Sequence, residues 1–150
     1  MERHASLPDA ARRKFILSQS KPFIAIVDDD ESVCRAIKRL VRSLSMEAET
    51  FASGQEFTDL IEAMPSFHPD CVVLDVQMPG MNGLEVQARM ARLGSPIPII
   101  FITAHDEAGA RERALTAGAV AFLRKPFDDE LFSKTLGEAL KRSAGQKQIV

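Results

Sequence analysis

The feature that most constrains the fold of this chain is a fivefold alternation between two hydrophobic patterns. Short runs rich in Val, Ile and Phe predict buried strands, and each is followed by a longer stretch whose apolar residues recur every three or four positions, as in an amphipathic helix. Such alternation is typical of βαβ units, whose right-handed crossovers favour an open parallel sheet covered by helices on both faces. A closed barrel would need eight units and is excluded.

The expected strands and helices follow from this pattern. Strands are expected at about 23–27, 48–51, 71–74, 97–102 and 120–123, and helices at about 31–45, 53–64, 84–93 and 106–117, with a last helix capped by Asp128. The apolar side chains expected to face inward include Met64 on the second helix and Leu131, Thr135, Leu136, Ala139 and Leu140 on the last.

The predicted domain covers residues 22–143. Pro22 disfavours helix at the preceding residue and marks a boundary, so residues 1–21 are interpreted as an extension, either disordered or an added helix. Residues 144–150 are expected to be a fraying tail. Only seven residues follow Ser143, so a second domain that binds DNA is not expected, although the sequence cannot tell whether the chain is a truncated piece of a longer protein.

Composition limits the class of protein. With 45% apolar residues, 27% charged residues and a net charge of -2, the chain resembles an ordinary globular domain, without broad attraction to nucleic acid or to an anionic membrane. Neither a signal peptide nor a run long enough to span a bilayer is apparent, so a cytoplasmic location is expected. Cys34 and Cys71 lack the spacing of a zinc site and are interpreted as buried, inert thiols.

Polar side chains follow four of the five expected strands. The first strand ends in the acidic run Asp28–Asp30, the third in Asp75 and the fourth in Thr103, and Lys125 follows the fifth. Ligands of open parallel sheets bind beyond the carboxyl ends of the strands, near the point where strand order reverses. If the order is 2-1-3-4-5, these side chains converge on one pocket.

Carboxylates gathered in this way favour a magnesium site. They repel one another unless a cation neutralises them, and Mg²⁺ prefers oxygen ligands such as those of Asp28, Asp29 and Asp75. A carboxylate can also attack phosphorus, with Lys125 and Thr103 placed to stabilise the phosphoryl oxygens. Because no Walker-type glycine loop occurs, we expect the phosphoryl group to come from another protein rather than directly from a nucleotide.

Four separated segments resemble motifs of the receiver domain of bacterial two-component response regulators. They are Ile26–Asp30 (IVDDD), Leu74–Gly83 (LDVQMPGMNG), Ile102–Ala104 (ITA) and Phe122–Phe127 (FLRKPF), within a likeness that covers about residues 22–143. The resemblance implies a flavodoxin-like, doubly wound five-stranded parallel sheet of order 2-1-3-4-5. It also implies a stand-alone receiver that takes a phosphoryl group on Asp75 from a histidine kinase or a phosphotransfer protein.

The resemblance assigns further roles around Asp75. It implies that Asp28 and Asp29 bind Mg²⁺ directly or through water, and that the backbone carbonyl of Gln77 completes the metal shell. Thr103 and Phe122 are the implied switch residues. They would remodel the face formed by helix 106–117, strand 120–123 and the last helix, where a downstream protein or a second copy of the chain would bind.

The resemblance also implies a cis peptide bond at Lys125–Pro126 and slow loss of the phosphoryl group, but no main role as an enzyme. A weaker hypothesis gives the side chains of Gln77 and His105 an influence on the dephosphorylation rate, since each lies two residues beyond a strand end. Neither the identity of the kinase and the target nor the phosphate lifetime can be read from the sequence.

Purely structural roles for these residues, and two rival functions, remain open at this stage. Taken alone, Asp28–Asp30 would be a helix-capping turn, Lys125 a solvated surface charge and Phe122 a core residue. One rival function is a small-molecule phosphatase with Asp75 as nucleophile, although Gln77 stands where such enzymes of the haloacid dehalogenase type carry a second aspartate. A second rival is a phosphate-independent adaptor that keeps only the fold.

Overall fold

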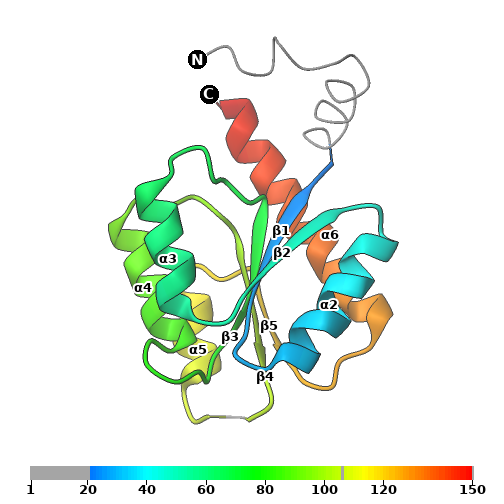
Figure 1. Cartoon of the computed structure of the whole chain (residues 1–150), viewed down its shortest axis with the longest axis vertical. Helices are drawn as coiled ribbons and strands as arrows, with labels where there is room; N and C mark the ends of the chain where they lie inside the picture. The colour runs from blue at the N-terminus through cyan, green and yellow to red at the C-terminus, as the bar shows by residue number, and fades with distance from the viewer. Residues whose placement is uncertain (1–20, 106, 150) are drawn as a thin grey trace.

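The computed structural model of the chain describes residues 21–105 and 107–149, and this part forms a five-stranded parallel sheet between two layers of helices (Figure 1). The predicted extension lies outside the described residues, apart from Lys21. The elements are β1 (Phe23–Val27), α2 (Glu31–Ser43), β2 (Glu47–Phe51), α3 (Gly54–Ala63), β3 (Cys71–Asp75), α4 (Gly83–Arg92), β4 (Ile99–Thr103), α5 (Ala110–Thr116), β5 (Ala121–Arg124) and α6 (Asp129–Ile149).

The strand order is β2-β1-β3-β4-β5, which confirms the predicted doubly wound sheet. The order reverses at β1, whose neighbours are β2 on one side and β3 on the other. Because all the strands are parallel, their carboxyl ends meet at one edge of the sheet. This edge is where the polar residues that follow the strands are gathered.

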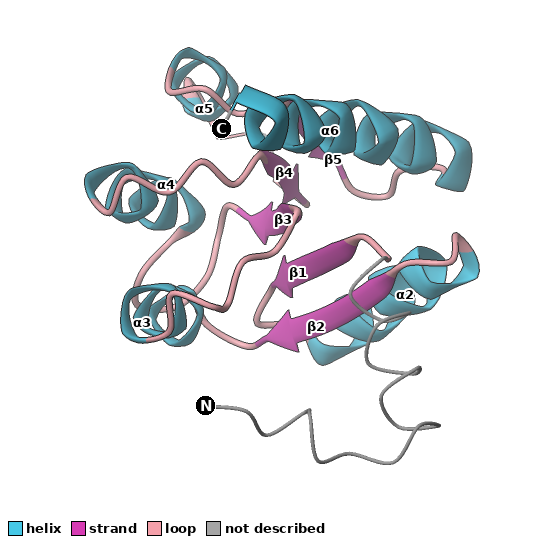
Figure 2. Cartoon of the chain, turned by 90° about the horizontal axis from the view of Figure 1, so that it is seen from above, coloured by secondary structure: helices cyan, strands magenta, loops and turns pink. Residues whose placement is uncertain are grey.

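The sheet separates two hydrophobic cores. Figures 1 and 2 show α3, α4 and α5 on one face, and α2 and α6 on the other. Alternate residues of the central strands point to opposite faces, so Val27 packs in the core under α3 and α4 whereas Ile26 packs in the core under α2 and α6. Burial on both faces explains why the central strands are nearly continuous hydrophobic runs.

Side-chain caps fix where four helices begin, and the cap of α6 is the predicted one, Asp128, which accepts a hydrogen bond from the Leu131 amide at 2.6 Å. Asp30 accepts hydrogen bonds from the amides of Ser32 and Val33 at the start of α2, and Ser53 accepts one from Glu56 at the start of α3. A capping box starts α4: Asn82 accepts from the Glu85 amide, and the Glu85 carboxylate accepts from the Asn82 amide. These caps set the phase in which each helix presents its apolar side to the sheet.

Two helix boundaries differ from the sequence prediction by more than two residues. Helix α5 begins at Ala110 rather than near residue 106, since Gly109 takes a left-handed conformation with φ of 80° at its N-cap. Residue 106 itself lies outside the described residues. At the carboxyl end, α6 does not fray after Ser143 but continues to Ile149.

Two side chains predicted to face inward point outward instead. Leu131 is 45% exposed, whereas Phe132 is fully buried and shares its face with Leu136 and Ala139 at helical spacings of four and seven. Met64 is 48% exposed because it is the C-cap of α3, where the backbone has already left the helical conformation. The predicted inward positions of Thr135, Leu136 and Ala139 are confirmed.

None of the described helices combines the length and the apolar composition that crossing a membrane would require.

Candidate functional site

Strand register brings two aspartates together at the carboxyl edge of the sheet. Val27 of β1 pairs with Leu74 of β3, so the residues that follow them, Asp28 and Asp75, are neighbours across the two strands. Both side chains come from strands buried on both faces, and the two residues are only 1% and 5% exposed. The sheet therefore holds two acidic groups where little water reaches them.

Asp29 adds a third carboxylate at the open side of this pair. One carboxylate oxygen from each of Asp28, Asp29 and Asp75 lies within 4.8 Å of the other two, and Asp29 is exposed. An all-oxygen set of this size fits a hard cation such as Mg²⁺, which is commonly held by one or two carboxylates and several waters. These three carboxylates could therefore hold the predicted Mg²⁺ ion.

Lys125 closes the site from the β5 side. Its Nζ lies 3.0 Å from Asp28 Oδ2 and 3.6 Å from Asp75 Oδ1, although Lys125 and Asp28 are 97 residues apart in the sequence. Burial alone would lower the pKa of Lys125, but its hydrogen bond to Asp28 and its proximity to Asp75 raise that pKa above the usual value. The ammonium group therefore stays charged and neutralises part of the acidic cluster.

The carboxyl group of Asp75 is strongly perturbed. Burial and the charge of Asp28 raise the pKa of Asp75 from 3.8 to about 6, against the opposing effect of Lys125. A raised pKa means that the folded protein resists ionising this carboxyl group. A cation at the three carboxylates would relieve that resistance.

Gly83 supports the backbone beneath Asp75, a role that the sequence analysis did not identify. A Cβ atom at position 83 would collide with the backbone carbonyl oxygen of Asp75, and the Gly83 amide donates to the Val76 carbonyl at 2.8 Å. Only glycine allows α4 to begin this close to the end of β3. The signal available in the sequence was the Asn82-Gly83 pair, which lies directly before the helix expected at about 84–93.

Thr103 lies at the end of β4, next to β3, as predicted, but its hydroxyl group has a specific partner. Its Oγ1 donates to the His105 carbonyl at 2.7 Å and accepts from the His105 amide at 3.2 Å. The single hydroxyl hydrogen is therefore committed to the loop after β4. To donate to a ligand at Asp75, Thr103 would first have to release the His105 carbonyl.

The remaining predicted residues surround this centre. Phe122 is half-buried and packs on Phe101 with ring centroids 6.0 Å apart, and its backbone carbonyl accepts a hydrogen bond from Arg111. The Gln77 side chain is exposed and, with Glu107, lines a small pocket beside the loop after β3. The cis peptide bond predicted at Lys125–Pro126 is present.

Both cysteines are buried, as predicted, and one contacts the acidic loop. The Cys34 thiol donates to the Asp28 backbone carbonyl at 3.2 Å, and burial together with the Asp28 charge raises the pKa of Cys34 to about 11. Burial raises the pKa of the Cys71 thiol as well. Both thiols therefore stay protonated near neutral pH, in keeping with a packing role.

The sequence of this chain is similar to those of known response regulators. The sequence profile of the family described as response regulator receiver domain matches residues 24–136. The chain is 38% identical over 132 residues to the response regulator protein TmoT of Ectopseudomonas mendocina, covering 88% of this chain and 59% of that protein. It is also 38% identical over 131 residues to TodT of Pseudomonas putida, covering 87% of this chain and 56% of the relative.

A solved structure of a receiver protein is also similar to this chain, in both sequence and fold. A response regulator receiver protein from Burkholderia phymatum is 60% identical, with a TM-score of 0.73, and the match covers 81% of this chain and 96% of that one. The chain thus spans little more than half the length of these two curated relatives, and nearly the whole of the solved receiver structure.

Proposed function

This chain belongs to the response regulator receiver domain family of two-component signal transduction, and from that premise we propose that Asp75 accepts a phosphoryl group from a histidine kinase or a histidine phosphotransfer protein. The observation that carries the proposal is the grouping of Asp75 with Asp28, Asp29 and Lys125 at the carboxyl edge of the sheet. We further propose that the receiver domain comprises residues 22–143, which enclose the family match.

The proposed reaction is a transfer from nitrogen to oxygen. One oxygen of the ionised Asp75 carboxylate attacks phosphorus and forms a P–O bond, while the P–N bond to the donor histidine breaks and its electron pair returns to the imidazole. Lys125 lies 3.6 Å from an Asp75 oxygen, so its ammonium group is close enough to stabilise charge on the incoming phosphoryl oxygens. Its hydrogen bond to Asp28 holds it there.

We propose that Asp28, Asp29 and Asp75 hold Mg²⁺, with the Gln77 backbone carbonyl as a further ligand. Bound Mg²⁺ would supply positive charge that favours the ionised carboxylate and offsets phosphoryl charge. The raised pKa of Asp75, caused by burial and by Asp28, supports this assignment because a neighbouring cation favours the ionised form of a buried carboxyl group. Water attack on the phosphoryl group would then return Asp75 slowly to its free state.

The signalling step is proposed to run through Thr103 and Phe122. Thr103 would exchange its hydrogen bond to the His105 carbonyl for one to the phosphoryl group, and Phe122, half-buried on Phe101, would turn further inward. These two movements would alter the face made by α5, β5 and α6. A downstream protein, or a second phosphorylated copy of the chain, is proposed to bind there rather than nucleic acid.

The proposal is tested by treating the protein with acetyl phosphate, with and without Mg²⁺, and measuring its intact mass. We expect one phosphoryl adduct that needs Mg²⁺ and is released by hydroxylamine, as an acyl phosphate is. Asp75→Asn should abolish the adduct, whereas Asp59→Asn, on an exposed helix position, should retain it.

Two outcomes would contradict the proposal. Retention of the adduct in the Asp75→Asn variant would assign the phosphoryl group to another residue, and absence of any adduct in the wild type would favour a phosphate-independent adaptor. Release of many equivalents of phosphate per protein from a generic phosphate ester would indicate a phosphatase instead.

A further inference from the structure

Helix α5 packs on the sheet through small side chains. Its two fully buried residues, Ala110 and Ala114, are both alanines, and Leu115 is only partly buried. The neighbouring helix α4 buries Val86 and Met90 instead. Because the free energy of packing grows with the apolar area removed from water, the hydrophobic face of α5 anchors it less firmly than that of α4.

The two ends of α5 lie next to residues that can act as hinges. Gly109 precedes the helix with φ of 80°, and Gly118 follows it with φ of 105°. Glycine adopts these left-handed conformations at little cost and changes between backbone conformations more easily than other residues. Hinge motions are absorbed by a few such positions at the ends of an element, so α5 can shift as a unit between its two glycines.

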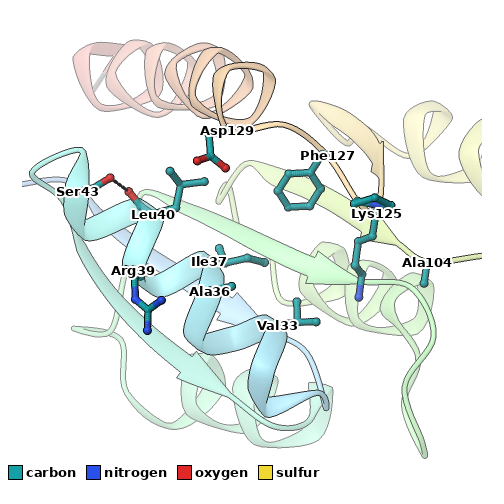
Figure 3. A pocket seen from close by; sticks show the side chains of 11 residues that line it. Val33, Ala36, Ile37, Arg39, Leu40, Ser43, Ala104, Lys125, Phe127 and Asp129 are labelled. Carbon is teal, nitrogen blue, oxygen red and sulfur yellow. Dashed lines mark hydrogen bonds between the residues drawn. The ribbon is translucent and has the colours of Figure 1, made fainter.

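The segment that follows β5 is anchored more firmly. Lys125 donates to Asp28 at 3.0 Å, and Phe127 stacks on Phe132 with ring centroids 5.3 Å apart. Figure 3 shows Lys125 and Phe127 across a groove of about 700 Å³ from α2, which lies on the face of the sheet opposite to α5. Of the two segments that flank β5, α5 is therefore the one that the packing leaves able to move.

One buried polar side chain joins α5 to α4. Gln87 is 6% exposed, and its Nε2 donates to the Ala114 carbonyl at 3.0 Å. The same carbonyl accepts from the Ala119 amide at 3.0 Å, so the Gln87 bond holds the last turn of α5. Gln87 lies beside Val86 on the buried side of α4, where the helical pattern favours an apolar residue. A buried amide is tolerated there only while it keeps its partner.

Open space next to Gln87 leaves room for such a shift. A groove of about 470 Å³ runs between α4 and α5 beside Leu84 and Arg113, and a smaller one of about 190 Å³ extends toward the start of β4. Gln87, Ala91 and Ala117 line both grooves. Close-packed side chains normally resist the sliding of one helix along another, and here the hydrogen bond from Gln87 takes the place of that packing.

We propose that Gln87 is a positioning residue that holds α5 in its resting place and thereby restrains the switch at Asp75. The inference rests on the function proposed above. When Thr103 exchanges the His105 carbonyl for the phosphoryl group, the loop that leads from β4 into α5 would follow, and the Gln87 bond would oppose that movement. By linkage, a bond that favours the resting state also opposes phosphorylation.

The restraint on α5 can be measured without phosphorylation, by hydrogen exchange of the full chain in EDTA with mass spectrometry of its peptides. Gln87→Met keeps the length of the side chain and removes its hydrogen bond. We expect the α5 amides to exchange about two- to tenfold faster, the factor that one hydrogen bond contributes to a local opening equilibrium. Amides of β1 and β3 should keep their rates.

The matched control is Gln55→Met. Gln55 is an exposed glutamine of α3 that donates to Asp59 of its own helix, so its replacement should leave the exchange of α5 unchanged.

The effect on the switch is measured as the rate at which acetyl phosphate and Mg²⁺ form the adduct. If Thr103 can donate to the phosphoryl group only after α5 has shifted, Gln87→Met should form the adduct faster by about the same factor as its α5 amides exchange. Gln55→Met should react at the wild-type rate. A purely structural role would leave the rate unchanged, since Gln87 bonds to α5 rather than to a residue of the Asp75 site.

Two results would overturn the proposal. Exchange of α5 that stays at the wild-type rate, or rises only in parallel with β1 and β3, would mean that Gln87 does not hold α5 in particular. Faster exchange of α5 with an unchanged rate of adduct formation would mean that Gln87 has no influence on the switch.

Failure of the proposed function would look different. A wild type that forms no adduct would overturn the role of Asp75, and with it the influence of Gln87 on the switch. The exchange experiment would still decide whether Gln87 holds α5 in place.

Discussion

Replacing Asp75 with Asn should raise the free energy of unfolding near neutral pH, even though it removes the proposed phosphoacceptor. The reason is that the folded protein holds this carboxylate at a cost: burial and the Asp28 charge raise its pKa from 3.8 to about 6. Asparagine has a similar shape and no charge, so it keeps the packing at the end of β3 and removes the repulsion from Asp28.

The expected gain follows from linkage between pKa and stability. A shift from 3.8 to about 6 corresponds to about 3 kcal/mol in favour of the neutral form. Because the folded pKa is raised, the folded state binds more protons than the unfolded state between these two values, and this carboxyl group makes the protein less stable as the pH rises through about 4 to 6. The advantage of the Asn variant should therefore be full above about pH 6 and vanish below about pH 4.

The assay is urea unfolding in EDTA at several pH values, comparing the wild type, Asp75→Asn and Asp59→Asn. Asp59 serves as the control of opposite sign, because its hydrogen bonds with Arg89 and Gln55 lower its pKa and its replacement should cost stability. Adding Mg²⁺ should stabilise the wild type and narrow its difference from Asp75→Asn, since only the wild type offers all three carboxylates.

An Asp75→Asn variant that is no more stable than the wild type near neutral pH in EDTA would refute this reasoning. A gain that persists unchanged at low pH would also refute it, because the Asp75 carboxyl group is then protonated and the charge argument no longer applies. In either case the acidic cluster would not be under the electrostatic strain that the geometry indicates.

Two further predictions concern the packing around the site. Gly83→Ala should lower the free energy of unfolding by about 1–3 kcal/mol, because the new methyl group meets the Asp75 backbone carbonyl, whereas Gly137→Ala, in open space on α6, should raise it by about 0.5–1 kcal/mol. Urea unfolding of both variants measures the two changes, and equal effects would contradict the prediction. Phe132→Ala should lower the free energy of unfolding by about 3–5 kcal/mol, and Leu131→Ala by no more than about 0.5 kcal/mol, as measured by thermal unfolding. The reverse ranking would mean that Leu131 faces the sheet, as the sequence predicted.

Most of the fold could be predicted because the hydrophobic pattern and the topology rules act together. Strands buried on both faces give continuous runs such as Ile24–Val27, and right-handed crossovers then leave few arrangements of the sheet. The grouping of Lys125 with Asp28 could be predicted from the rule that the carboxyl ends of parallel strands share one edge of the sheet. No local pattern links two residues so far apart.

What the sequence could not provide depends on local geometry. Leu131 and Phe132 are adjacent apolar residues, and only the position of the Asp128 cap decides which of them faces the sheet. The hydrogen bond from Thr103 to the His105 carbonyl depends on how the loop after β4 turns, and the continuation of α6 to Ile149 follows no cap or breaker in its sequence. The close approach at Gly83 is a contact between two backbones, which leaves no hydrophobic pattern to detect.

The pairing of Asp28 with Lys125 also has a consequence for biosynthesis. Asp28 and Asp29, which follow β1, are translated early, but their cationic partner is translated only after β4 and β5. A nascent chain therefore carries Asp75 for some time without Lys125. If Asp75 is the phosphoacceptor proposed above, a chain that stops before Lys125 should therefore be a poor substrate for a phosphoryl donor.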